Sequence, residues 1–227
     1  MVPAMQMTKS ESAPAPASAR PSSEAPARAK IREAAAGLFC ATGYEGTSVA
    51  TIAGQAGVTK AAVFYHYGSK EQLFDEVLDG YYERQRELFT EAVAGEGDPR
   101  ARMHRVVDVY FRYLVDNRRY LMLVISVLAS DSPHSENIQK SVTPLVEWLR
   151  QEVAGAVPEE GPSSIEHLYV TVAGAINHYF SHARTLEDIF RGPMMSEEAL
   201  AERAAHLHWL VDAIFARIAT DADANAK

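Results

Sequence analysis

The chain has 227 residues, 47% of them hydrophobic, which is enough for one large packed domain or two small ones and excludes a disordered protein. Its longest apolar run, residues 120–129, is about half of the roughly 20 residues that a membrane-spanning helix needs. The formal net charge is −8, yet residues 26–70 carry +3 and residues 71–227 carry −11. A basic module on an acidic body is typical of a protein that contacts phosphates at one end.

The single cysteine, Cys40, excludes an intramolecular disulfide and is typical of a protein in a reducing cytoplasm. The N-terminus also lacks the charged start, apolar stretch and cleavage site of a secretory signal. We therefore expect a cytoplasmic protein. Cys40 lies in an apolar helical pattern, which favours a small buried thiol, with a redox switch as the alternative.

Helix signals recur from Pro26 onward, and no segment shows the alternation of apolar and polar residues that indicates a strand. The sequence therefore predicts an all-α protein. Residues 1–25, rich in Ala, Pro and Ser, are predicted to form a disordered tail. The first helix is predicted from about Pro26 to Thr42, with Gly43 ending it in a left-handed conformation.

Two short helices follow, separated by a glycine turn. The first begins after the capping residues Thr47 and Ser48 and ends at Gly57, and Thr59 caps the second, which reaches about His66. A capping box over residues 69–72 then starts a long fourth helix. This is the pattern of a helix-turn-helix element, in which the first short helix braces the second so that its N-terminal residues project into a major groove.

Longer helices are predicted beyond residue 97. One opens at Asp98-Pro99, a buried helix covers residues 120–129, and Pro144 should kink or divide the helix that follows Ser132-Pro133. A second capping box is predicted over residues 163–166. The last two helices are long and amphipathic, so they could close the domain's own core or pair with a second chain. We predict pairing, through the stripe formed by Leu200, Leu207, Val211, Ile214 and Ile218.

The residues of the helix-turn-helix are specific enough to identify a family. Residues 43–49, 52–53, 56–60 and 63–73 resemble the DNA-binding domain of TetR/AcrR-family regulators. The resemblance implies an all-α homodimer of about nine helices that binds a palindromic double-stranded DNA operator, usually as a repressor. It implies release when a small-molecule effector enters the C-terminal domain. The predicted domains are the tail (1–25), the helix-turn-helix domain (26–75) and a ligand-binding and dimerisation domain (76–222).

Carried over position by position, the resemblance assigns DNA contacts to the start of the second helix, to the third helix and to the start of the fourth. The residues are Ser48, Thr59, Lys60, Ala61, Ala62, Phe64, Tyr65, His66 and Lys70. Lys60 would read a base edge and Lys70 would hold a phosphate, although both could be solvated lysines. His66 could be a packed histidine. Ala61 and Ala62 would allow close approach to the groove and contact with a thymine methyl.

The sequence departs from the family at two of these contact positions. Phe64 stands where many members have a phosphate-contacting tyrosine, so we interpret it as core or as a lost contact. Ala50 stands where arginine is common, which removes another potential DNA contact.

Aromatic and methionine residues of the later helices could be plain core, or they could surround an effector. We favour an apolar or aromatic effector, because ligand sites are commonly apolar pockets with a few polar anchors. The candidate residues are Phe89, Met103, Tyr110, Met122, Trp148, Tyr169 and Asn177, and His167 is a further candidate anchor.

No enzyme motif and no cofactor motif is present. The pairs His178/His182 and His206/His208 lack further ligands, so we predict no metal site. The rival hypotheses are a DNA-binding architectural protein of the same fold without an effector, and an enzyme with a helical body.

Overall fold

The computed structural model describes residues 24–95, 97–130, 132–190 and 192–225, and nearly all of the predicted tail at 1–25 lies outside them. Within these ranges α-helices are the only regular secondary structure, which confirms the predicted all-α class. The helices are α1 (Glu24–Gly46), α2 (Val49–Ala56), α3 (Lys60–Tyr67), α4 (Lys70–Val93), α5 (Pro99–Leu128), α6 (Ser135–Glu152), α7 (Ile165–Ser181), α8 (Ala183–Phe190) and α9 (Glu197–Asn225).

Local capping signals place the ends of the N-terminal helices. The side chains of Ser48, Thr59 and Ser69 each accept a hydrogen bond at 3.1 Å from the backbone N–H three residues later. These bonds satisfy N–H groups that have no partner within the helix, which confirms the predicted starts of α2, α3 and α4. Gly43 interrupts α1 at φ 74°, as predicted, but a further turn of helix continues to Gly46.

The helix α5 is kinked where the sequence predicts two helices. Its dihedral angles are non-helical at Asn117 (φ −119°, ψ 26°), between the part that opens at Pro99 and the part that ends at Leu128. The predicted helix over residues 120–129 corresponds to the part of α5 after this kink. This part is not fully buried, because Met122 and Leu128 are 43% and 55% exposed.

Two further predictions concern the C-terminal region. Pro144, which the sequence predicts to kink or divide its helix, does not divide α6, because the helix continues from Ser135 to Glu152 with the proline inside it. The predicted capping box at the start of α7 is also absent. Ser164 donates its hydroxyl to Glu166 at 2.6 Å instead of capping a backbone N–H, and that carboxylate is paired with Arg150 as well.

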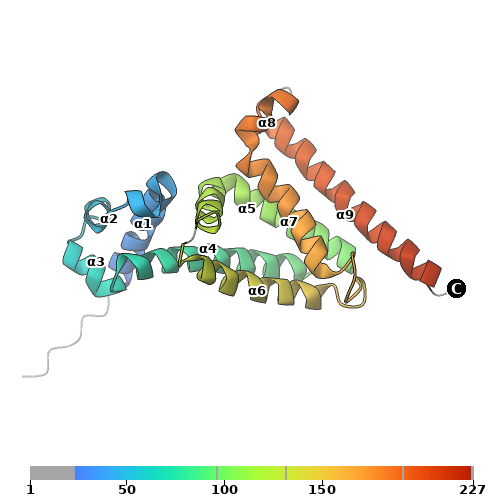
Figure 1. Cartoon of the computed structure of the whole chain (residues 1–227), viewed down its shortest axis with the longest axis horizontal. Coiled ribbons are helices and arrows are strands. Elements are labelled where there is room, and N and C mark those ends of the chain that lie inside the picture. Colours follow the sequence, from blue (N-terminus) through green and yellow to red (C-terminus); the bar gives the residue numbers. More distant parts are fainter. Residues whose placement is uncertain (1–23, 96, 131, 191, 226–227) are drawn as a thin grey trace, which may run out of the picture.

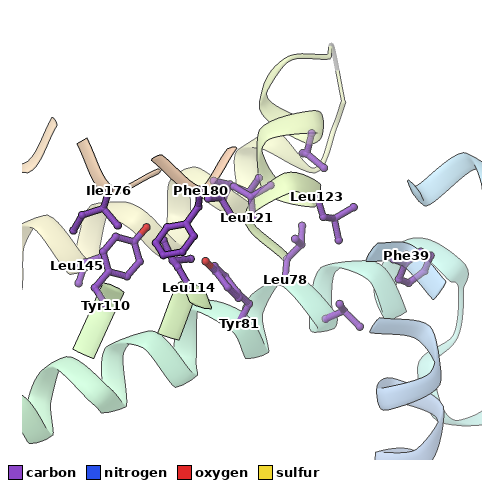
Figure 2. Close-up of a cluster of buried hydrophobic side chains, with 14 of the residues drawn as sticks. Phe39, Leu78, Tyr81, Tyr110, Leu114, Leu121, Leu123, Leu145, Ile176 and Phe180 are labelled. Carbon is purple, nitrogen blue, oxygen red and sulfur yellow. The ribbon is translucent and has the colours of Figure 1, made fainter. Parts of the chain in front are cut away.

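The helices form an elongated molecule in which α1, α2 and α3 lie at one end and α7, α8 and α9 at the other (Figure 1). The long helix α4 joins the two ends, and α6 lies alongside it. Buried side chains form one continuous core along the molecule, from Phe39 on α1 past Leu78 on α4 to Ile176 on α7 (Figure 2). No helix within the described ranges combines the length and apolar character that crossing a membrane requires.

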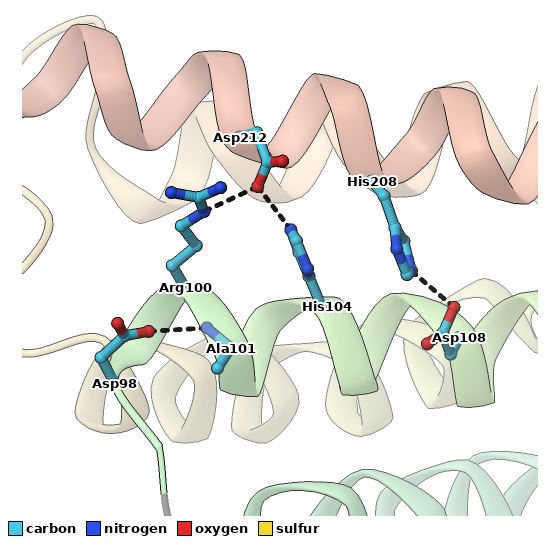
Figure 3. Close-up of polar contacts among 7 residues, drawn as sticks. All are labelled: Asp98, Arg100, Ala101, His104, Asp108, His208 and Asp212. Atoms are coloured by element: carbon cyan, nitrogen blue, oxygen red, sulfur yellow. Dashed lines mark hydrogen bonds and ion pairs between the residues drawn. The ribbon is translucent and has the colours of Figure 1, made fainter.

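A polar seam joins α5 to α9 on the outside of the C-terminal region (Figure 3). Asp212 accepts a hydrogen bond from Arg100 at 2.7 Å and lies 2.7 Å from His104, although this second pair is not aligned as a hydrogen bond. One turn earlier on α9, His208 lies 2.6 Å from Asp108, and its ring stacks on that of His104. The Arg100–Asp212 ion pair and the two His–Asp contacts thus join α5 to α9.

Candidate nucleic-acid interface and ligand cavity

The two short helices present the start of α3 to solvent. Ile52 on α2 and Val63 on α3 are buried, so both helices are anchored to the core by their inward faces. Thr59, Lys60 and Ala61 are exposed at the N-terminal end of α3. A recognition helix reads bases with this end, so the local fold leaves the predicted base-contacting residues free to enter a groove.

The second half of α3 is also more exposed than expected. Phe64 is 48% exposed and Tyr65 is 74% exposed, whereas His66 is half-buried. The interpretation of Phe64 as a core residue is therefore wrong. Val63 and Tyr67 occupy the inward face of the helix, and Phe64 shares the outward face with Lys60, one turn earlier.

Lys70 holds the end of α1 in place. Its ammonium donates hydrogen bonds to the backbone carbonyls of Tyr44 at 2.9 Å and Thr47 at 3.1 Å, and it lies 3.9 Å from the centroid of the Tyr44 ring. Two of its three N–H donors are thus engaged within the chain, which leaves one for a phosphate. The exposed Ser48 follows Thr47, so Lys70 also fixes the start of α2. Sequence reasoning gave Tyr44 and Thr47 no part in this arrangement.

The C-terminal region encloses an apolar cavity of about 60 Å³. Four of the predicted effector-contacting residues line it, namely Phe89, Met103, Tyr110 and Tyr169. The other lining residues are Gln85, Val106, Val107, Leu149, Val153, Val157, Ile165, Leu168, Val172, Ala173, Ile176, Val211, Ile214 and Phe215. The cavity therefore draws its wall from α4, α5, α6, α7 and α9 together.

Three predicted effector-contacting residues do not line the cavity. Met122 lies beyond the bend of α5, in a separate hollow that it shares with Cys40 of α1, so its assignment is wrong. Trp148 stacks behind Phe89, with ring centroids 6.2 Å apart. Asn177 lies behind Tyr110 and accepts a hydrogen bond from its hydroxyl at 2.6 Å.

Polar groups are few in the cavity wall. The buried Tyr110 hydroxyl is one, and burial raises the pKa of that phenol although hydrogen bonds to Asn177 and Gln85 oppose the rise. Gln85 is only 5% exposed, and sequence reasoning missed it because a glutamine on a long helix is usually a surface residue. His167 is exposed and is not in the wall, so its assignment as an anchor is wrong.

Cys40 and the pair His178/His182 were candidates for a redox switch and a metal site. Burial raises the pKa of the half-buried Cys40 thiol to about 11, so the thiol is protonated at neutral pH and is a weak nucleophile. The rings of His178 and His182 stack 4.1 Å apart. No group of three or more potential metal-ligating side chains is present in the part of the chain that the structure describes.

The apolar stripe of α9 faces inward. Leu207 and Val211 have exposed fractions of 0% and 1%, because they pack in the core of their own chain. The prediction that these two residues form a dimer contact is therefore wrong. Exposed apolar side chains of this region include Trp209 on α9, at 63%, Val170 on α7, at 68%, and Ile189 and Phe190 on α8.

A helix-turn-helix at one end and a helical bundle at the other are the parts of a DNA-binding transcription regulator. The family model for bacterial regulatory proteins of the tetR family matches residues 31–77. The model for the tetracyclin repressor-like C-terminal domain matches residues 99–211. The chain belongs to the TetR family, whose members are DNA-binding transcription factors and not enzymes.

Relatives include two named repressors. The chain is 30% identical to the HTH-type transcriptional repressor KstR2 of Rhodococcus jostii, over 42% of this chain and 55% of the relative. It is 23% identical to the repressor NicS of Pseudomonas putida, over 77% of this chain and 85% of the relative. The match to KstR2 thus spans only about half of that protein's length.

Among solved structures, FadR from Bacillus subtilis, in complex with stearoyl-CoA, has a TM-score of 0.66 at 14% identity. That match covers 81% of this chain and 96% of FadR, and at this identity it shows the shared fold alone.

Proposed function

We propose that the chain is a homodimeric repressor whose release from a palindromic operator is controlled by a small apolar or aromatic effector. The observation that carries this proposal is the placement of α4. Its first residue, Lys70, lies against the helix-turn-helix, and its later turns supply Gln85 and Phe89 to the cavity wall. If α4 can adopt two placements, a ligand that binds one placement more tightly than the other will shift the equilibrium between them.

The DNA contacts follow from the exposure of α3. Lys60 and Ala61 would reach base edges in the major groove, with Thr59 and Ala62 beside them. Phe64, Tyr65 and His66 would lie near the phosphates at the other end of α3. Ser48 and the remaining donor of Lys70 would hold phosphates at the starts of α2 and α4, because helix N-termini favour anions.

The effector chemistry follows from the cavity wall. Its residues are apolar except for Gln85 and the hydroxyls of Tyr110 and Tyr169, which favours a largely apolar ligand with a few hydrogen-bonding groups. The cavity volume of about 60 Å³ is small for an effector. We expect a larger ligand to move α4, α5 or α7 apart, and such movement is what a switch requires. FadR, which binds stearoyl-CoA, shows that this fold accommodates a ligand with a long apolar portion.

Dimerisation is proposed through the outer faces of α7 and α9. A palindromic operator needs two recognition helices about 34–36 Å apart, and a single chain supplies one. Trp209 and Val170 are large apolar side chains on these two helices that are mostly exposed in the single chain. A second copy of the chain, related by a twofold axis, would bury Trp209 and Val170 of both chains at once.

A binding experiment tests the DNA part of the proposal. Duplex DNA selected from a random library supplies the operator, and its affinity is measured by fluorescence anisotropy at several salt concentrations. We expect Lys60→Ala to cost about 1–3 kcal/mol and to relax specificity at one position in each half-site. Lys140→Ala, which removes an exposed lysine of α6, is the matched control. Equal affinity in wild type and Lys60→Ala would contradict the assignment.

A second experiment tests the switch. A thermal-shift screen of apolar and aromatic compounds identifies candidate effectors, since a ligand of the native state raises the melting temperature. Calorimetry then measures the affinity of a hit with and without saturating operator. We expect the operator to weaken effector binding about 5- to 150-fold, by thermodynamic reciprocity. If no compound binds, the architectural protein without an effector becomes the better hypothesis.

A further inference from the structure

His134, directly before α6, packs into the DNA-binding end of the molecule. His134, the N-cap residue of α6, is 5% exposed, and its ring packs edge-on against Tyr44 and Phe74, with centroids 4.8 Å and 4.6 Å away. Its Nδ1 lies 2.6 Å from Oδ1 of Asp75 on α4. A carboxylate only accepts hydrogen bonds, so the ring donates through Nδ1–H, and this bond fixes the orientation of the ring.

Tyr44 contacts both His134 and Lys70. Tyr44 gives its carbonyl oxygen to the Lys70 ammonium, and its ring lies beneath that ammonium. The contacts therefore run without a gap from His134 through Tyr44 to Lys70, at the start of α4. The rings of the buried His134 and the half-buried Tyr44 are in edge-to-face contact, so a shift of one displaces the other.

The other end of α6 reaches the cavity. Leu149 and Val153 line it, and α6 is about 27 Å long at ~1.5 Å per residue for its 18 residues. The helix α6 thus has His134 at the DNA-binding end and cavity-lining side chains at the other. This is a direct path from α6 to the end of α1, in addition to the path along α4.

We propose that His134 is a positioning residue for operator binding: bonded to Asp75, it holds Tyr44 in place and thereby sets the position of the Lys70 ammonium at the DNA-binding surface. The inference rests on the proposed phosphate contact of Lys70. It adds that this contact depends on a residue at the start of α6, 64 positions later in the chain.

The test is a double-mutant cycle on the full-length protein with the selected operator. His134→Phe keeps a ring but loses the donor, and we expect it to weaken operator affinity about five- to fiftyfold, within the range of coupling between contacting residues. It should also lower the salt slope by about one per subunit, as the loss of one phosphate contact does. In a Lys70→Ala background, His134→Phe should have no further effect.

Three variants guard against a purely structural explanation. Asp75→Ala removes the same hydrogen bond from the more exposed partner, so it replaces His134→Phe in the test if that variant does not fold. It should reproduce the weaker operator affinity and the lower salt slope. Asp75→Asn keeps an acceptor and should restore both. His208→Phe is the matched control, because it breaks a second His–Asp contact of 2.6 Å in the seam of α5 and α9, and operator binding should not change.

The outcomes separate the inference from the function on which it rests. If Lys70→Ala weakens binding and both His134→Phe and Asp75→Ala do not, the positioning role of His134 is overturned while the phosphate contact stands. If His134→Phe weakens binding equally with and without Lys70, the route through Lys70 is overturned. If Lys70→Ala leaves affinity and salt slope unchanged, both the contact and the inference fail.

Discussion

Replacing Trp209 by glutamate should separate the proposed dimer into monomers. The side chain is 63% exposed in the single chain. A buried tryptophan covers up to about 250 Å², so the dimer would bury about 160 Å² more of it, worth roughly 4 kcal/mol per chain at ~25 cal/mol/Å². A twofold interface contains this contact twice. Even if half of the gain is realised, its loss raises the dimer dissociation constant by about three orders of magnitude.

Light scattering over a dilution series measures this constant directly, and anisotropy with the selected operator measures the functional consequence. We expect Trp209→Glu to be monomeric and to bind the operator weakly, because only one half-site is then contacted at a time. Leu128→Glu is the matched control, since Leu128 is a comparably exposed apolar residue at the end of α5 and should leave the dimer intact. A Trp209→Glu variant that stays dimeric and binds normally would refute the proposed interface.

Three further predictions follow from other parts of the structure. Tyr110→Phe removes the 2.6 Å hydrogen bond to Asn177 and should cost about 1–2 kcal/mol of stability, which lowers the melting temperature by roughly 2–4 °C per kcal/mol. Tyr120→Phe is the control, because this half-buried ring stacks on Tyr81, and it should lower the melting temperature far less. Equal losses in the two variants would contradict the role of the Tyr110 bond. Phe64→Tyr should leave stability unchanged, because the ring is 48% exposed, and should tighten operator binding about two- to tenfold through a new phosphate bond; a loss of stability would show that the ring is enclosed. The hydrogen bond from Arg100, and then the charge of His104, lowers the pKa of Asp212 below 3.8, so this carboxylate stabilises the fold above that pH and the contribution is lost as the pH falls through the lowered pKa. The melting temperature of Asp212→Asn should therefore lie below that of wild type at pH 7 and approach it in acid, and a constant difference would contradict the assignment.

Local signals in the sequence were enough to predict the helix-turn-helix. The caps at Ser48, Thr59 and Ser69 act on backbone groups three residues away, so they can be read without knowing the fold. The exposure of Lys60 at the start of α3 follows from the same caps. Apolar periodicity likewise predicted most of the later helices, because a helix that packs on a core needs one apolar face.

Periodicity could not say what each apolar face meets. Leu207 and Trp209 are both large apolar residues of α9, yet the first is buried against its own chain and the second is open to solvent. Met122 and Met103 both lie on α5, and the change of direction at Asn117 separates one from the cavity that the other lines. These outcomes depend on the angles at which whole helices cross, which no short window of sequence contains.

The sequence by itself therefore determined the class of fold, the family and the position of the DNA-binding helix, because these rest on interactions within a few residues. Only the tertiary structure decided which side chains surround the cavity and how the start of α6 reaches the DNA-binding end. The contact of His134 with Tyr44 joins residues 90 positions apart, and that of Lys70 with Tyr44 joins residues 26 apart. Neither leaves a periodic or capping signal, since both exist only where packed helices bring distant residues together.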